Sequence, residues 1–206
     1  MFKIRIRFSK TGTLCYIGHL DFLKVFTQTI RRSKLPIAYS QGFNPHQIIS
    51  FALPLPLGME SINDYLDISI VSELPESEVV EKLNAAAPPG LTILAAYTPD
   101  GATAAAATVT ADYLLAVDVS DDAIKKVLDS EEIVIPKKTK SGIKNTDIRP
   151  DILDIKKIQG GVLLHLSAGS ARFINPLLVM QQLTDKPPCN SKLTRLELYK
   201  EGRIPL

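Results

Sequence analysis

Two histidines stand among small and polar residues, His19 at the expected start of a helix and His46 at the end of a polar loop. Two imidazoles beside a basic surface can cleave RNA without a metal, because one takes the 2′-hydroxyl proton while the other protonates the leaving oxygen. The structural alternative is that His19 begins a helix and His46 braces a turn. We favour that alternative, so the sequence predicts no catalytic residue, and His19 and His46 stay as the rival catalytic pair.

Metal and cofactor chemistry has little support in the spacing of the remaining residues. The cysteines are Cys15 and Cys189, far apart and without a C-x-x-C companion, and the three histidines are equally dispersed. Such spacing predicts neither a disulfide framework nor a metal site. No glycine-rich nucleotide fingerprint follows an expected strand, so we expect neither a metal nor a cofactor.

Positive charge is concentrated at the start of the chain. The first 47 residues carry eight Lys or Arg side chains against one acid, whereas residues 60–81 carry seven acids, so the net charge of +2 conceals the asymmetry. Charge segregation of this kind indicates a surface for a polyanion, above all nucleic acid, with a merely solvated surface as the alternative. The expected RNA-contacting cations are Lys3, Arg5, Arg7, Lys10, Arg31, Arg32 and Arg149.

A polar loop at residues 39–46 follows these cations. Gly42 gives its backbone freedom, and Asn44 is held extended by the proline that follows it. Such a loop can present polar groups to a ligand or partner, and a purely structural turn is the alternative. The expected ligand or partner residues are Tyr39, Ser40, Gln41, Gly42, Asn44 and His46. We also expect this loop and Arg149 to be neighbours on one functional surface.

The elements that position these residues follow a β-α-β-β-α-β order in the first half. Residues 1–8 alternate as a strand, and a helix begins near residue 19, with Gly18 as N-cap and Asp21 in its first turn. Further strands are expected within 37–55 and at 65–71 and 91–97, with a helix at 76–87. This order places two helices on one face of an antiparallel sheet and leaves Lys3, Arg5 and Arg7 on the open face.

The second half repeats the same order after a linker. Strands are expected at 109–119, 133–136, 152–158, 162–168 and 192–199, and helices at 121–129 and 177–183. The predicted fold class is α+β, a tandem of two ferredoxin-like βαββαβ units with antiparallel sheets. The predicted domains are 1–98 and 109–206, joined by the linker 99–108. No apolar run is long enough for a membrane span or a signal peptide, so a cytoplasmic location is expected.

Several motifs point to a known family. They share small or polar residues at loops and helix starts and include residues 8–12, 18–21, 35–46, 55–58 and 147–150. In these the chain resembles the bacterial radical-SAM-linked family DUF2344, from which it departs at Gly18 and Gln47, where Ser and Pro are usual. The resemblance implies a companion of a radical-SAM protein, working near the ribosome or a ribonuclease. Any radical chemistry would belong to the partner, since three closely spaced cysteines are missing here.

The leading prediction is an RNA-binding accessory module that presents tRNA or rRNA to a radical-SAM partner for RNA modification. A metal-independent endoribonuclease, resembling the tandem ferredoxin-like enzymes that process CRISPR repeats, is the rival. The third possibility is a protein-interaction module that docks through residues 39–46 without contacting RNA.

Overall fold

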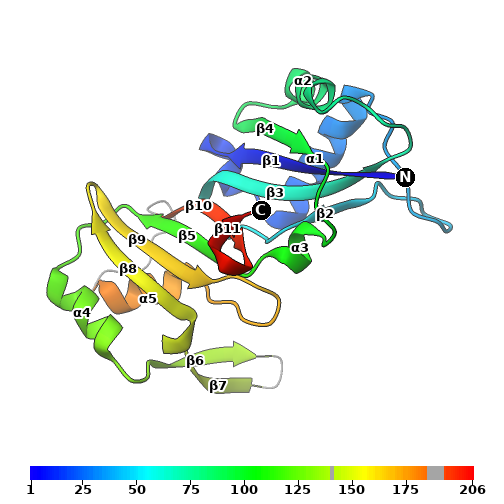
Figure 1. Ribbon diagram of the computed structural model, residues 1–206. Helices are drawn as coiled ribbons and strands as arrows, with labels where there is room; N and C mark the ends of the chain where they lie inside the picture. The colour runs from blue at the N-terminus through cyan, green and yellow to red at the C-terminus, as the bar shows by residue number, and fades with distance from the viewer. Residues whose placement is uncertain (140–141, 185–192) are drawn as a thin grey trace.

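The computed structural model describes residues 1–139, 142–184 and 193–206 (Figure 1). The elements of the first half are β1 (Phe2–Lys10), α1 (His19–Ser33), β2 (Ile49–Phe51), β3 (Glu60–Ile70), α2 (Glu76–Ala86), β4 (Leu91–Tyr97) and α3 (Ala104–Ala107). The elements of the second half are β5 (Thr110–Leu115), α4 (Asp121–Asp129), β6 (Val134–Thr139), β7 (Gly142–Asp147), β8 (Ile152–Ile158), β9 (Gly161–Ser167), α5 (Pro176–Leu183), β10 (Leu193–Lys200) and β11 (Ile204–Pro205).

The first unit has the strand order β4–β1–β3, with β2 paired to β3. Its core forms because β1 alternates: Ile6 and Phe8 are fully buried on the side of α1, where Phe26 is also fully buried. The rings of Phe8 and Phe26 meet edge to face, 5.3 Å between centroids. Each buried phenylalanine contributes about 1.5–3 kcal/mol through the apolar surface it removes from water. This packing fixes which face of β1 is inside.

The second unit repeats this arrangement with the order β10–β5–β9–β8. β8 and β9 form a hairpin at residues 160–161, where Gly161 has a φ of +156° and a Cβ would stand 2.1 Å from the Leu115 carbonyl oxygen. The order of strands and helices confirms the predicted fold class, two ferredoxin-like units in tandem with antiparallel sheets.

The two units share one sheet, because β3 and β10 pair in parallel at Glu60–Thr194 and Ser61–Arg195. Arg195 is fully buried and reaches into the first unit, donating to Asp64 Oδ2 at 2.5 Å and to the Leu53 carbonyl at 3.0 Å. A buried ion pair loses far more when one partner is removed than an exposed pair does. At the junction the sheet is therefore continuous from one unit to the other, and buried polar contacts of Arg195 link the two units.

One predicted strand belongs elsewhere than expected. The strand expected at 133–136 forms as part of β6, but β6 pairs with β7 as a separate two-stranded hairpin outside the main sheet.

Residues 104–107, within the expected linker, form the short helix α3. Cys189 and the start of the strand expected at 192–199 lie outside the described residues. Across the described ranges, no helix is both long and apolar enough to cross a membrane.

Candidate nucleic-acid interface

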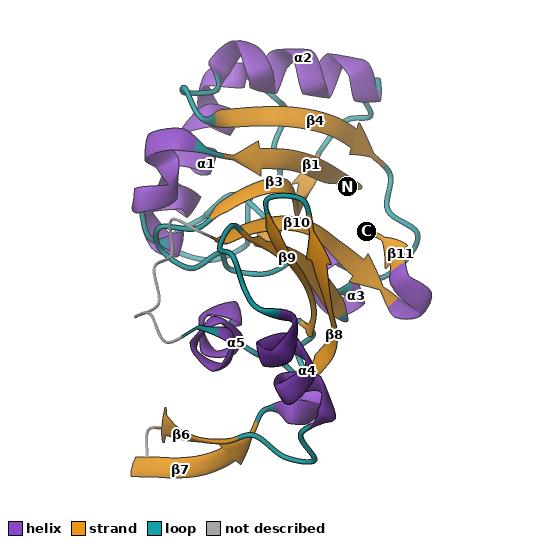
Figure 2. Ribbon diagram, turned by 90° about the vertical axis from the view of Figure 1, so that its left-hand side faces the viewer, coloured by secondary structure: helices purple, strands orange, loops and turns teal. Residues whose placement is uncertain are grey.

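The sheet face opposite α1 is not open at Arg5. Arg5 is 2% exposed; its Nε donates to Asp67 Oδ1 at 2.8 Å, and its Nη2 donates to the Ala102 carbonyl at 2.8 Å. The Ala104 N–H also donates to Asp67 Oδ2, at 2.7 Å. Figure 2 shows α1 on one side of the sheet and α3 on the other. The expectation that Arg5 contacts RNA on an open face is therefore wrong, because the segment entering α3 covers it.

Lys10 is also unavailable to RNA. It is 1% exposed, its Nζ donates to the Ile17 carbonyl at 3.1 Å, and it stands 4.7 Å from the centroid of the Phe22 ring. Burial lowers the pKa of Lys10, because the charged form is desolvated. Lys10 shares the even-numbered face of β1 with Phe8, which is the helix side. Lys3 is exposed, and Arg7 is half-buried with an unpartnered, buried Nε.

Two further cations that were predicted to contact RNA, Arg32 and Arg149, donate hydrogen bonds to carbonyls at the C-terminal ends of helices. Arg32 donates twice to the Ala86 carbonyl, from Nη2 at 2.9 Å and from Nε at 3.3 Å, and so ties α1 to the last turn of α2. Arg149 donates to the Leu128, Ser130 and Ile152 carbonyls at 2.6, 3.2 and 2.8 Å. Carbonyls at a helix C-terminus lack partners within the helix, and cations satisfy them well. Arg149 thus caps the end of α4.

The expected proximity of Arg149 to the loop 39–46 is wrong. In Figure 1 the light-blue loop projects beside the N-terminus, whereas β6 and β7 lie at the bottom of the molecule, in the second unit. Arg149 lies two residues after the end of β7, and the hydrogen-bond partners given above all belong to the second unit. The two segments therefore lie at opposite ends of the protein and do not form one surface.

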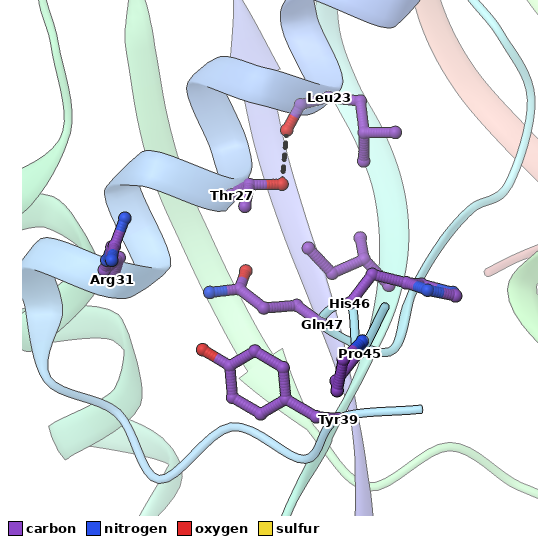
Figure 3. A pocket seen from close by; sticks show the side chains of 8 residues that line it. Leu23, Thr27, Arg31, Tyr39, Pro45, His46 and Gln47 are labelled. Atoms are coloured by element: carbon purple, nitrogen blue, oxygen red, sulfur yellow. Dashed lines mark hydrogen bonds between the residues drawn. The ribbon is translucent and has the colours of Figure 1, made fainter. Parts of the chain in front are cut away.

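Arg31, by contrast, meets the predicted loop at a cavity of about 390 Å³ between α1 and residues 39–49 (Figure 3). Arg31 is exposed and forms no ion pair with any described residue. The cavity has the size of many small-molecule sites, which are mostly apolar with a few placed polar groups. Its lining consists of Leu23, Thr27, Arg31, Tyr39, Pro45, His46, Gln47 and Ile49.

The loop is closed at its base by Ser40 and His46. The Ser40 N–H donates to the His46 carbonyl at 2.8 Å, the His46 N–H donates to Ser40 Oγ at 3.1 Å, and that oxygen lies 2.9 Å from His46 Nδ1. Gly42 has a φ of +123°, a region that glycine adopts most readily. Because residues 40 and 46 hold the base, Phe43 at the tip is left fully exposed, at 105%.

The cavity contains one buried polar group without a partner. The Gln47 side chain is 7% exposed, and its Oε1 is buried without a hydrogen bond. Figure 3 shows its amide between the ring of Tyr39 and helix α1, while the imidazole of His46 points away. An unsatisfied buried oxygen costs about 1–3 kcal/mol. The arrangement can accommodate a ligand that supplies a donor to Gln47 and negative charge to Arg31.

The two histidines of the rival catalytic pair have separate surroundings. The ring of His19 packs edge-on against Phe51, 5.2 Å between centroids, and His19 is not among the residues that line the cavity. His46 lies beside Ser40. In the described ranges, no three His, Cys, Asp or Glu side chains come together as metal ligands would.

Phe43 and Gln47 are candidate functional residues that the sequence pattern did not single out. A signal for Phe43 was present, because an aromatic residue between Gly42 and Asn44 has no apolar neighbours in the sequence to pack with. Gln47 carried no such signal, because it is a polar residue that follows a polar loop. Its burial depends on α1, which precedes it by many residues.

Comparisons with known proteins identify a family and find similar solved structures. The family described as "Uncharacterized protein conserved in bacteria (DUF2344)" matches residues 3–176. Among solved structures, the chain is similar to one chain of the crystal structure of a Cbf5-Nop10-Gar1 complex, with 14% identity and a TM-score of 0.42. That match covers 97% of this chain and 50% of the solved chain, so the protein spans half the length of that relative. No curated protein matches.

Proposed function

The chain belongs to the DUF2344 family, and on that premise we propose that it is an RNA-binding accessory module that presents tRNA or rRNA to a radical-SAM partner. The observation that carries RNA binding is the meeting of Arg31 with the loop 39–47, whose tip exposes Phe43. The partnership rests on the motifs that resemble the radical-SAM-linked family. It is a separate part of the proposal and has its own test.

Exposed aromatic and cationic side chains suit unpaired RNA. Bases in loops and bulges stack on aromatic rings, and each such stack is worth about 1–3 kcal/mol. Phe43 and the half-exposed Tyr39 offer ring faces, while Arg31 and Lys24 offer charge along α1. Lys24 is partly neutralised by Asp21, 2.9 Å away. Arg31 is therefore the cation best placed for a phosphate.

This interface differs from the one that alternation in β1 predicted. With Arg5 and Lys10 buried, the proposed contacts come from α1 and the loop, and phosphate binding by a row of strand cations is abandoned. The new surface includes aromatic rings, so it favours single-stranded segments over duplex shape. Phosphate contacts at Arg31 still make binding depend on salt.

RNA affinity at several salt concentrations tests the proposal. We expect Phe43→Ala to weaken binding of single-stranded RNA about tenfold through lost stacking. Arg31→Ala should weaken binding and reduce the salt slope by about one ion. Matched controls are Leu20→Ala, which removes another exposed apolar side chain (71%), and Lys125→Ala, which removes an exposed charge on α4. Absence of salt-dependent RNA binding by the wild-type protein would refute the RNA-binding part.

The partnership is tested by co-expression with a radical-SAM protein from the same genome. Co-purification in the presence of ribonuclease would support direct contact. If RNA but no radical-SAM protein is recovered with the chain, the partnership is refuted and the RNA-binding part of the proposal stands.

A further inference from the structure

We propose that the cavity between α1 and residues 39–49 binds a single nucleotide, with its base against the Gln47 amide and its phosphate at Arg31. This inference rests on the proposed function when the nucleotide is an unpaired residue of RNA. The same chemistry is offered by a free mononucleotide, and the experiment below distinguishes these two sources.

The Gln47 amide is the first observation. Gln47 is more than nine-tenths buried and its Oε1 lacks a hydrogen-bond partner, although Gln47 lines the cavity and its amide lies between the Tyr39 ring and α1 (Figure 3). A primary amide pairs side by side with a ring edge that carries one donor and one acceptor. Adenine has such an edge, because its N6 amino group and neighbouring ring nitrogen meet both ends of the amide, and cytosine presents the same pattern at N4 and N3.

The backbone holds this amide in position. Gln47 and Tyr39 form an isolated antiparallel bridge, in which the Ser40 N–H donates to the His46 carbonyl and the Ile48 N–H donates to the Ala38 carbonyl at 3.0 Å. Ala38 is bound in turn to β3, through its N–H and the Ser69 carbonyl at 2.7 Å. The loop is therefore anchored to the sheet, so the amide is placed before a ligand arrives, which lowers the cost of ordering on binding.

The rest of the cavity suits a flat ring with a charged tail. Tyr39 is 47% exposed and presents its ring beside the amide, and Leu23 and Ile49 supply apolar surface. Thr27 already donates its hydroxyl to the Leu23 carbonyl at 2.8 Å, so its oxygen is left as an acceptor. Figure 3 places Arg31 at one end of the cavity, on the α1 side. A base can lie inside while its phosphate remains at the rim.

Calorimetric titration of the full chain with small ligands tests the base contact, first in the wild-type protein and then in three variants. The probes are AMP, ribose 5-phosphate and inorganic phosphate, and AMP should bind at least tenfold more tightly than ribose 5-phosphate. Gln47→Met has similar length and no amide, and should lower AMP affinity to that of ribose 5-phosphate while leaving ribose 5-phosphate affinity unchanged. Arg31→Ala should weaken both ligands, and Lys125→Ala should weaken neither. Equal binding of AMP and ribose 5-phosphate by the wild-type protein would overturn the inference.

Competition with RNA separates this inference from the proposed function. If AMP displaces single-stranded RNA, both the RNA-binding function and the nucleotide site stand, and the bound nucleotide is a residue of RNA. If RNA binds with the Phe43 dependence described above but AMP binds no better than ribose 5-phosphate, the nucleotide site is refuted and RNA binding stands. If AMP binds with the Gln47 dependence but no RNA binds, RNA binding is refuted and the cavity takes a free nucleotide.

Discussion

Arg5 and Asp67 stand opposite each other in the β1–β3 pairing, and Arg5 Nε lies 2.8 Å from Asp67 Oδ1. Both side chains are at most 4% exposed. The same carboxylate accepts the Ala104 N–H, so one acid holds both the buried cation and the segment that folds across the sheet. At Arg5, the face that strand alternation predicts to be basic and open is covered by the segment that leads into α3.

Asp67→Asn should strongly destabilise the protein. The substitution keeps the shape of the side chain but leaves Arg5 buried without a counter-charge, which costs about 3–5 kcal/mol of unfolding free energy. Urea denaturation measures this loss. The matched control is Asp21→Asn, whose partner Lys24 is 73% exposed, and its expected effect is within about 0.5 kcal/mol. Equal effects of the two substitutions would contradict the structural role of the buried pair.

Arg149→Ala should lower stability and leave RNA affinity unchanged. The side chain donates to three backbone carbonyls at the end of α4 and the start of β8, and their loss costs about 2 kcal/mol. Thermal and urea unfolding, with RNA titration at a temperature where the variant is folded, separate the two effects. Lys156→Ala serves as control, because Lys156 is 63% exposed and pairs at 2.9 Å with Asp154, which is itself 36% exposed. If Arg149→Ala weakened RNA binding and left the unfolding free energy unchanged, Arg149 would instead be a residue of the RNA interface.

Asp147 should make stability depend on pH in acid. The backbone N–H groups of Ile133 and Arg149 donate to its Oδ1 at 2.8 and 3.0 Å and lower the pKa of this carboxyl below its ordinary 3.8. Because the pKa is lower in the folded state, the carboxylate stabilises the protein above the unfolded pKa, and this contribution is lost as pH falls through the folded pKa.

The Asp147→Asn variant tests this sign. Its unfolding free energy should be lower than that of the wild-type protein at neutral pH, and the difference should shrink below about pH 4. Urea denaturation across a pH series measures it. A difference that grows on acidification would show that another group at the base of the β6–β7 hairpin is responsible.

Cellular RNA incubated with the protein should give the same fragments as RNA incubated with the His19→Ala, His46→Ala double variant. His19 packs against Phe51, and the His46 imidazole points away from the Gln47 amide, so neither ring faces the proposed base contact. Denaturing gels of end-labelled RNA provide the measurement. Reproducible cleavage that disappears in the double variant would instead favour an endoribonuclease.

The sequence by itself determined the local elements and their order. β1 follows from the alternation of Ile4, Ile6 and Phe8, and α1 begins at His19 after Gly18, with Asp21 in its first turn, as expected. These features depend on residues only a few positions apart, because strand and helix periodicities are local. Because the β-α-β-β-α-β order of elements occurs twice along the chain, the sequence predicted two ferredoxin-like units.

Only the tertiary structure decided which polar residues are accessible. Whether Arg5 faces water depends on Ala102 and Ala104, which lie about a hundred positions further along the chain and return over the sheet. Whether Gln47 faces a cavity depends on α1 packing opposite its loop. A charged or amide side chain has the same local pattern whether it is solvated or buried, since the difference lies in long-range partners that compensate its desolvation. Charge segregation in the sequence therefore located the basic segment, and packing selected the side chains within it that are free to bind.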